Sequence, residues 1–473
     1  MGKNVRLGFI LFFALGLRLI SLNQSLWLDE AIQVTAVSGH SLKNLLFQYF
    51  QNEFHPPLSY LISWIWMRIL GDSEVISRLP SVILGVANVW LVYLLADKVL
   101  PKVKIGLVKI KLSLAEIAAL LLAAAPLHIY YSQEARSYVL ACFLGTWSIY
   151  QFLKIINGER TNWRYLIATS LLLYSHYLVW FLLPVQAIFL YIWKKKLIWP
   201  RFIKTWGLSL LLFAPWLPIL VHQLEIGRGV AQTLPVWAQL GALSFKNTAL
   251  IPIKFMIGRI SVENNFVYIS IIALLILFNA WIISKARAGF CWLWLILPIG
   301  LGMVISLQIP VLQYFRFLFV LPAFYLLLTT GLSRINRRWQ TKALLVLLVI
   351  NLTSSGIYLF NQNFHREDWR SAVKFVQVRD ANPAVVMIKA VQAPYNYYDQ
   401  GQSRMVGYRE IEKIRFEKRI WLVKYAQPIF EPDNQTEEKL KGYGFIEANE
   451  NHFRGVTIKY LVNPSGLTAE KLE

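Results

Sequence analysis

Two acidic residues follow the first apolar segment of the chain, in the stretch SLWLDEAIQ. Asp29 and Glu30 come directly after an apolar run that begins near Leu7. An aspartate in such a place can accept a proton from a hydroxyl or bind a metal ion. The alternative is structural, because the macrodipole of a helix also favours acidic side chains in its first turn. We take Asp29 and Glu30 as candidate catalytic residues.

A third candidate catalytic acid, Glu134, lies in the short turn HIYYSQEARSY between two apolar runs. The flanking segments orient so short a turn and hold its side chains in place. Tyr131 and Arg136 of the same turn are candidate substrate-binding residues. The alternative is a surface ion pair between Glu134 and Arg136, which would contribute little to stability.

Basic residues at the ends of other apolar runs are candidates for holding a phosphate. Arg78 lies in SRLPS and Arg316 in QYFRF, and a guanidinium group matches the geometry of a phosphate group. The alternative for both is that the side chain extends to lipid headgroups.

Two histidines complete the set of candidate substrate-binding residues. His55, in NEFHPPL, is followed by two prolines that fix a turn and present its ring. His176 lies in SHYLVW, at the end of another apolar run. Alternatively, His55 caps a helix that begins at the prolines, and His176 is an ordinary interfacial aromatic residue.

The elements that position these residues are membrane segments, as the composition indicates. Of the 473 residues, 56% are hydrophobic and 16% are charged, against about a quarter charged in ordinary globular domains. The mean hydropathy is +0.47. Cys142 and Cys291 both fall in apolar runs, and no role is assigned to either.

The net charge of +22 does not indicate a nucleic-acid partner. From His365 onward there are 17 basic and 15 acidic residues, so +20 lies in the apolar part, clustered in short loops. Such clusters are typical of cytoplasmic loops, and anionic lipid headgroups are their expected partners. We therefore expect a multi-pass protein of the cell membrane.

Eleven apolar runs are long enough to cross a bilayer, which takes about 20 residues. The first follows Lys3 and Arg6 without an acidic residue or a cleavage site, which predicts a cytoplasmic N-terminus and a retained first span. The eleven runs begin near Leu7, Leu79, Leu112, Ser137, Tyr165, Leu178, Thr205, Phe266, Phe290, Phe317 and Ala343.

The run Pro57–Leu70 is too short to be assigned by length, and the basic loops decide its location. If it crossed the bilayer, the lysine-rich loop 97–111 and every later basic loop would lie outside. If it lies at the interface, as Trp64 and Trp66 favour, these loops all lie inside. The basic loops are 97–111, 154–164, 194–204, 285–287 and 334–342.

This topology divides the chain into a transmembrane domain, 1–360, and a soluble extracytoplasmic α/β domain, 361–473. The first external loop is 23–78, and all the candidate residues face the outside. In the second domain, a helix is predicted over 367–377 and strands over 384–389, 419–425 and 455–462. No Gly-rich phosphate loop or zinc-type spacing is present, so no nucleotide cofactor is expected.

In this order, W-x-D-E, H-P-P-L, R-L-P-S, Y-Y-S-Q-E-A-R, Y-F-R-F and R-E-D-W-R resemble motifs of the polyprenyl-phosphate-sugar-dependent glycosyltransferases of the GT-C fold. The pattern is most similar to the bacterial branch of the protein O-mannosyltransferase family, which includes the aminoarabinose transferase of lipid A. The resemblance covers Trp27 to Arg316 and, more thinly, Arg366 to Arg370.

The resemblance implies inverting transfer of a sugar from a polyprenyl-phosphate carrier to an acceptor hydroxyl on the extracytoplasmic face. Asp29 would act as general base or orient the acceptor, and Glu134 would assist acceptor binding or ligate a divalent metal. Arg78, Arg316 and His55 would hold the carrier phosphate. The sugar, the acceptor and the metal requirement are left open, as is the role of the loop 221–265.

Two other functions use similar parts. A transporter or flippase of a lipid-linked sugar would share the spans and the arginines, but such proteins normally carry polar or broken helices near the middle of the membrane. A polysaccharide polymerase or ligase would use arginines in a large outer loop, and Arg228 in the loop 221–265 keeps this alternative open.

Overall fold

The structure, a computed structural model, describes residues 2–107, 110–193 and 198–464. Parts of the predicted loops 97–111 and 194–204, and the end of the predicted domain 361–473, lie outside these residues. The chain divides into two compact units. Unit 1 comprises Met1–Leu22, His40–Val230 and Leu240–Phe364, and unit 2 comprises Asn23–Gly39, Ala231–Gln239 and His365–Glu473.

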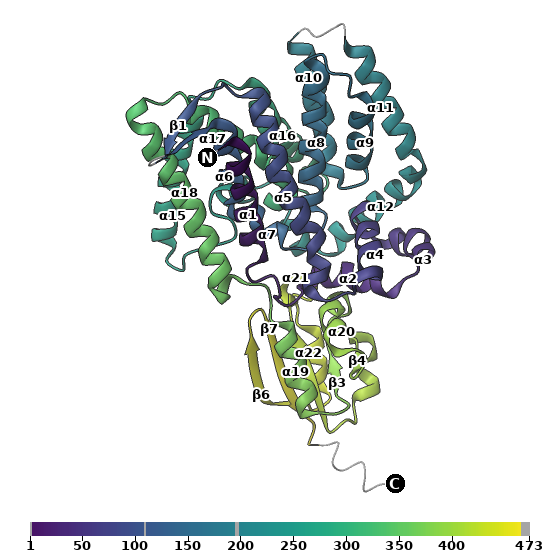
Figure 1. The fold of residues 1–473 in the computed structure, drawn as a ribbon. Coiled ribbons are helices and arrows are strands. Elements are labelled where there is room, and N and C mark those ends of the chain that lie inside the picture. The colour runs from purple at the N-terminus through teal and green to yellow at the C-terminus, as the bar shows by residue number, and fades with distance from the viewer. Residues whose placement is uncertain (1, 108–109, 194–197, 465–473) are drawn as a thin grey trace. The chain divides into compact units, whose positions relative to one another are not determined.

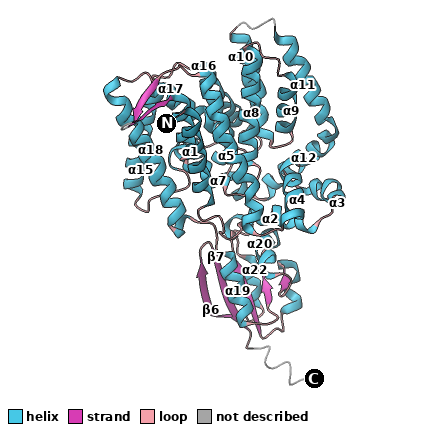
Figure 2. Ribbon diagram, viewed as in Figure 1, coloured by secondary structure: helices cyan, strands magenta, loops and turns pink. Residues whose placement is uncertain are grey.

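Unit 1 consists of helices, apart from one antiparallel hairpin of β1 (Lys104–Leu107) and β2 (Ile110–Ser113) (Figures 1 and 2). Helices occupy all eleven segments that were predicted to span the membrane. The helices are α1 (Lys3–Leu19), α3 (Leu42–Phe47), η1 (Tyr49–Asn52), α4 (Leu58–Leu70), α5 (Glu74–Val99), α6 (Leu114–Ala123), α7 (Pro126–Ser132), α8 (Tyr138–Ile156), α9 (Asn162–Leu173), η2 (Tyr177–Phe181), α10 (Leu182–Ile192), α11 (Trp199–Phe213), η4 (Ala214–Trp216), α12 (Leu217–Thr233), α14 (Phe245–Ile257), α15 (Asn265–Ile283), α16 (Gly289–Ile305), η5 (Tyr314–Val320), α17 (Leu321–Leu332), α18 (Arg337–Phe360) and η6 (Gln362–Phe364).

Six stretches of helix among the described residues are long and apolar enough to cross a membrane. The bent pair α6 and α7 would make a seventh, so the predicted number of eleven stays a prediction. Helix α4, which was predicted to lie at the interface, is one of the shorter apolar helices. The six are α5, α8, the continuous stretch Trp199–Val230, α15, Tyr314–Leu332 and α18.

Two helix breaks place polar residues of unit 1 at helix ends. The axes of α6 and α7 differ by 59°, and α7 begins at Pro126, a residue that suits the first turn of a helix but cannot continue one. After α9, His176 adopts an extended backbone before η2 begins. The polar turn 133–137 and His176 therefore both lie at points where helices are interrupted.

A buried polar network joins α1, α5 and α7 inside unit 1. The guanidinium of Arg18 donates to Nδ1 of His128 at 2.7 Å and to the hydroxyl of Ser132 at 3.1 Å. The amide of Asn88 lies 3.0 Å from Nε2 of the same histidine. All four side chains are fully buried, and Gly85 gives them room, because a Cβ there would lie 2.3 Å from the Ser132 hydroxyl.

Unit 2 is built on a mixed five-stranded sheet of order β4-β3-β5-β7-β6. Strand β3 is parallel to β4 and β5, and β7 is antiparallel to β5 and β6. The segments predicted as strands contain β3, β5 and β7, and the predicted helix is α19. The strands are β3 (Ala384–Val386), β4 (Arg404–Val406), β5 (Arg419–Lys424), β6 (Ile446–Phe453) and β7 (Val456–Val462). The helices are α2 (Leu28–Gly39), α13 (Pro235–Gln239), α19 (Trp369–Arg379), η7 (Lys389–Val391), α20 (Ala393–Asp399), η8 (Tyr408–Ile414), α21 (Gln427–Phe430) and α22 (Gln435–Gly442).

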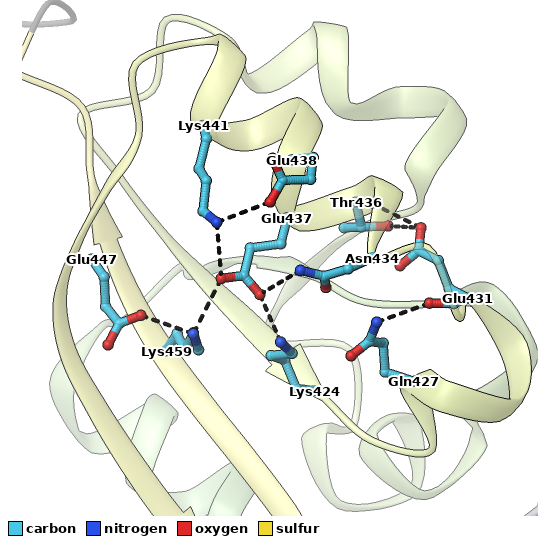
Figure 3. Close-up of polar contacts among 10 residues, drawn as sticks. All are labelled: Lys424, Gln427, Glu431, Asn434, Thr436, Glu437, Glu438, Lys441, Glu447 and Lys459. Atoms are coloured by element: carbon cyan, nitrogen blue, oxygen red, sulfur yellow. Dashed lines mark hydrogen bonds and ion pairs between the residues drawn. The ribbon is translucent and has the colours of Figure 1, made fainter.

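The two faces of this sheet are covered differently, because alternate residues of each strand point to opposite sides. On one face, Trp421 and Ile458 belong to a core that includes Trp369 of α19 and Leu28 of α2. On the other face, α22 is held to the sheet by Glu437, which pairs with Lys424 at 2.6 Å and with Lys459 at 3.2 Å (Figure 3). Burial raises the pKa of Glu437, but hydrogen bonds from these lysines outweigh it and lower the pKa to about 2.

Candidate functional site

His55 lies at the centre of a polar cluster at helix ends of unit 1. Its Nδ1 lies 2.6 Å from Oε1 of Glu53, and its Nε2 lies 3.2 Å from the guanidinium of Arg136. Because a carboxylate only accepts hydrogen bonds and a guanidinium only donates them, these partners assign the proton to Nδ1. A neutral His55 therefore links a carboxylate to a guanidinium.

The local sequence explains why His55 is held in place. It is followed by Pro56 and Pro57, after which α4 begins. Its side chain is 19% exposed, and its carbonyl and that of Phe50 accept hydrogen bonds from Gln223. Burial lowers the pKa of His55, as does the charge of Arg136, so the ring is neutral near pH 7.

Glu53 carries the negative charge of this cluster. Burial raises the pKa of its carboxyl, but the hydrogen bond from His55, the charge of Arg136 and the hydrogen bond from the Phe54 amide outweigh it and lower the pKa to about 2. The same carboxylate accepts a hydrogen bond from the Tyr49 hydroxyl at 3.2 Å. Glu53 therefore stays ionised over the physiological pH range.

His176 and Arg316 belong to the same neighbourhood. The rings of His55 and His176 lie 6.2 Å apart, and Tyr138 lies 6.0 Å from His176. Arg316, at the start of η5, donates to the carbonyl of Pro310 at 3.0 Å. Arg316 lies close enough to His55 and His176 for its positive charge to interact with both rings.

The predicted residues Tyr131 and Glu134 lie next to this group. Tyr131 packs edge-on against Tyr138 at 5.3 Å, and both Tyr131 and Glu134 are buried. Arg259, which follows α14, lies over the ring of Tyr130 at 4.7 Å and donates to its hydroxyl at 2.5 Å. Arg259 and Glu134 both lie close enough to Tyr131 for their charges to interact with its hydroxyl group.

Sequence reasoning missed Glu53 and Arg259. Glu53 stands two residues before the predicted His55, so an acid beside a histidine was a signal that could have been used. Arg259 lies in GRISVE, after a helix of thirteen residues that is not one of the apolar spans, and nothing in its local pattern marks it.

Arg78 has a different setting from the other predicted cations of unit 1. It is fully buried in α5, and its guanidinium donates to the carbonyl of Leu22 at 2.8 Å. This hydrogen bond fixes the chain just after α1. A contact between Arg78 and a phosphate stays a prediction.

The acidic pair of the first loop belongs to unit 2, in the first turn of α2. Glu30 is fully buried and lies 3.2 Å from Nε of Arg366, which is also buried. Asp29 is partly exposed. The two neighbours therefore differ, because Glu30 is held by an ion pair inside unit 2, whereas Asp29 reaches the surface.

A metal ion was left open in the sequence analysis. Among the described residues, no group of three or more histidine, cysteine, aspartate or glutamate side chains is arranged to hold a metal ion. The residues around Glu134 do not form such a group, and a metal ion ligated by Glu134 stays a prediction.

The sequence was compared with protein families and with curated proteins, and neither comparison gives a match. Comparison of the structure with solved structures does give matches. ArnT from Cupriavidus metallidurans bound to undecaprenyl phosphate is similar with a TM-score of 0.61 and 11% identity, over 97% of this chain and 98% of ArnT. ArnT in the apo state gives a TM-score of 0.58 and 12% identity, over 96% of this chain and 98% of ArnT.

A second similar protein is much longer than this chain. The arabinofuranosyltransferase AftD from Mycobacteria matches 98% of this chain with a TM-score of 0.51 and 15% identity, and the match covers 40% of AftD. ArnT and AftD are glycosyltransferases of the GT-C fold. Similarity over almost the whole chain shows that this protein has the GT-C fold of membrane glycosyltransferases.

Proposed function

We propose that the protein is a membrane glycosyltransferase that moves a sugar from a polyprenyl-phosphate carrier to an acceptor hydroxyl on the extracytoplasmic face. The cluster of Arg136, His55 and Arg316 in unit 1 carries the proposal. The similar fold of ArnT, whose structure contains undecaprenyl phosphate, supports it. The acceptor is a protein, a lipid or a glycan.

The cations of unit 1 suit a departing phosphate. When the bond between the anomeric carbon and the phosphate oxygen breaks, negative charge grows on that oxygen. Fixed guanidinium groups stabilise such charge without having to reorganise. We assign this role to Arg136 and Arg316. Arg136 is oriented by two linked hydrogen bonds, one between Glu53 and His55 and one between His55 and Arg136.

His55 is a positioning residue in this scheme. Its Nδ1 proton is directed to Glu53, and its Nε2 accepts from Arg136. A neutral imidazole adds no positive charge, so its contribution is to restrict the rotation of the guanidinium. This resembles the way in which outer partners orient the groups that contact a bound ion.

The acceptor hydroxyl needs a base, and we assign that role to Asp29. The base takes the proton while the acceptor oxygen attacks the anomeric carbon from the face opposite the phosphate. The bonding electrons leave with the polyprenyl phosphate, so the anomeric configuration inverts. Glu30 is less suited to this role, because it is fully buried in an ion pair with Arg366.

The test is a transfer assay with reconstituted protein. Proteoliposomes receive a radiolabelled polyprenyl-phosphate sugar and a membrane extract as acceptor. We expect label to move from the carrier to acceptor material, and Arg136→Ala to slow this transfer by about 10²–10³-fold. Movement of the carrier between leaflets without sugar transfer, unaffected by Asp29→Asn, would instead identify a transporter. A requirement for a pyrophosphate-linked oligosaccharide would identify a polymerase or ligase.

A further inference from the structure

A cavity of 160 Å³ opens on one face of the unit 2 sheet, where α19 ends. Helix α19 covers the sheet with Ala372, Val373 and Val376 and stops at Arg379. Three residues that line the cavity lie side by side on neighbouring strands. Asn449 of β6 is paired with Tyr460 of β7, which is paired with Trp421 of β5.

Three aromatic side chains, Phe375, Trp421 and Tyr460, line this cavity. The rings of Trp421 and Tyr460 lie 4.7 Å apart, and Phe375 packs edge-on against Trp421 at 6.0 Å. Trp421 is 4% exposed, whereas Phe375 and Tyr460 are only partly buried. Aromatic faces are apolar and slightly negative, so they suit a ring whose face consists of C–H groups.

The rim of the cavity is polar. Arg419 and Asp380 form an ion pair at 3.4 Å, and the indole nitrogen of Trp421 donates to the same carboxylate at 3.4 Å. A neighbouring carboxylate and guanidinium can accept and donate hydrogen bonds to two adjacent hydroxyls. The guanidinium of Arg379 lies over the ring of Phe375.

Asn451, one of the lining residues, has an unusual environment. Its Nδ2 is buried and makes no hydrogen bond to any of the described residues. A buried amide donor without an acceptor is costly, on the order of 1–3 kcal/mol. Asn451 lies two residues from Asn449, on the same face of β6, and both line the cavity. A turn of the Asn451 side chain towards the cavity would let its amide donate to a ligand hydroxyl between the two residues.

We propose that this cavity binds a single sugar ring, with its C–H face on Tyr460 and Phe375 and its hydroxyls at Asn449, Asn451 and the Asp380–Arg419 pair. The volume of 160 Å³ suits one ring, since pockets for drug-sized ligands are about 300–1,000 Å³. Such a site would hold a glycan independently of the residues assigned to transfer, and every lining residue belongs to unit 2.

Saturation-transfer NMR on the full-length protein in detergent tests the proposal. The probes are the methyl glycosides of glucose, mannose, galactose and arabinose, with adenosine as a flat aromatic comparison. We expect at least one glycoside to bind more tightly than adenosine. We expect Asn451→Ala to weaken binding about fivefold, which is the typical effect of one neutral hydrogen bond.

The variants are chosen to separate this cavity from the rest of the protein. Tyr460→Leu should abolish binding, and Asn449→Ala, on an exposed edge strand, tests the site without disturbing the core. Glu450→Gln is the matched control, because Glu450 lies on the opposite face of the same strand. Arg316→Ala should bind glycosides normally, so loss of sugar transfer and loss of this site are distinguishable.

Three results would overturn the proposal. The first is that no glycoside binds to the wild-type protein. The second is that binding is unchanged in Asn451→Ala, Asn449→Ala and Tyr460→Leu. The third is that adenosine binds more tightly than every glycoside.

Discussion

Unit 1 contains two clusters of arginine and histidine side chains that differ in how they are built. The inner cluster is the network of Arg18, Asn88, His128 and Ser132. The outer cluster is the polar group around His55. In the inner cluster, Arg18 donates to His128 and Ser132, and also to the carbonyls of Ala14 and Ala123. These partners are neutral, and none of the ion pairs among the described residues involves Arg18. In the outer cluster, by contrast, Glu53 and Arg136 carry opposite charges on the two sides of His55.

The difference teaches how to separate structural from chemical polar groups in a membrane protein. The inner side chains all lie within helices, and Gly85 lets these helices approach until each guanidinium nitrogen of Arg18 meets an acceptor. The outer residues come from turns and helix breaks, where several cations gather around neutral histidines. The inner cluster should therefore govern stability and the outer cluster activity.

The largest effect is expected in unit 2, where the same contrast separates two adjacent residues. Asp29→Asn should reduce sugar transfer by about 10²–10⁴-fold, since it removes the proposed general base. Glu30→Gln should instead destabilise the protein by about 1–3 kcal/mol, because Arg366 loses its buried carboxylate. Initial rates and thermal unfolding of both variants measure the difference. Near wild-type rates in Asp29→Asn would remove this residue from the mechanism.

The next effect concerns the outer cluster. Arg316→Ala should reduce transfer by about 10²–10³-fold, which is typical for loss of one donor that stabilises a growing negative charge. Thermal stability should change little. Arg334→Ala is the control, because Arg334 is exposed beyond the far end of the same helical segment. Full activity in Arg316→Ala would mean that Arg316 does not stabilise the departing phosphate.

A smaller effect is expected in the inner cluster. Gly85→Ala places a Cβ 2.3 Å from the hydroxyl of Ser132 and 3.1 Å from Nε of Arg18, and should cost about 1–3 kcal/mol of stability. The activity of the folded fraction should be unchanged. Gly16→Ala in α1 has open space around the new methyl group and serves as control. A loss of activity without a loss of stability would contradict the assignment.

The smallest effect is a dependence on pH. The pKa of Glu53 is lowered to about 2 from its usual 4.5. The ionised carboxylate therefore contributes stability that is fully present above pH 4.5 and is lost as the pH falls towards 2. Thermal unfolding in detergent between pH 6 and pH 3 should show this loss in the wild type and less of it in Glu53→Gln. The exposed Glu225→Gln should behave like the wild type.

Much of the fold could be predicted from the sequence, because hydrophobic runs and turn residues are local signals. The runs beginning near Leu7 and Ala343 are helices α1 and α18, and the strand predicted over 419–425 contains β5. The number of spans could not be settled in this way. Segments such as α9 are interrupted after a few turns, which depends on tertiary packing.

Sequence motifs predicted individual residues of the site, but not which of these residues contact one another. His55 and Arg136 were predicted separately, and the structure brings them within 3.2 Å. Their separation of 81 residues in the sequence hides this contact. Glu30 was predicted as catalytic beside Asp29, whereas its burial against Arg366 depends on a partner 336 residues away. Such long-range pairs leave no periodic pattern.

The contacts of the first loop with the tail also set an order of events during synthesis. The amide of Arg366 donates to Gln24, and Tyr398 accepts from the amide of Leu26. The ribosome adds about 5–20 residues per second. The residues that the first loop contacts in the tail are therefore made on the order of half a minute after the loop itself. Helix α2 cannot complete its native contacts until all the membrane helices have been made. A truncated chain would therefore carry Asp29 without the contacts that fix it.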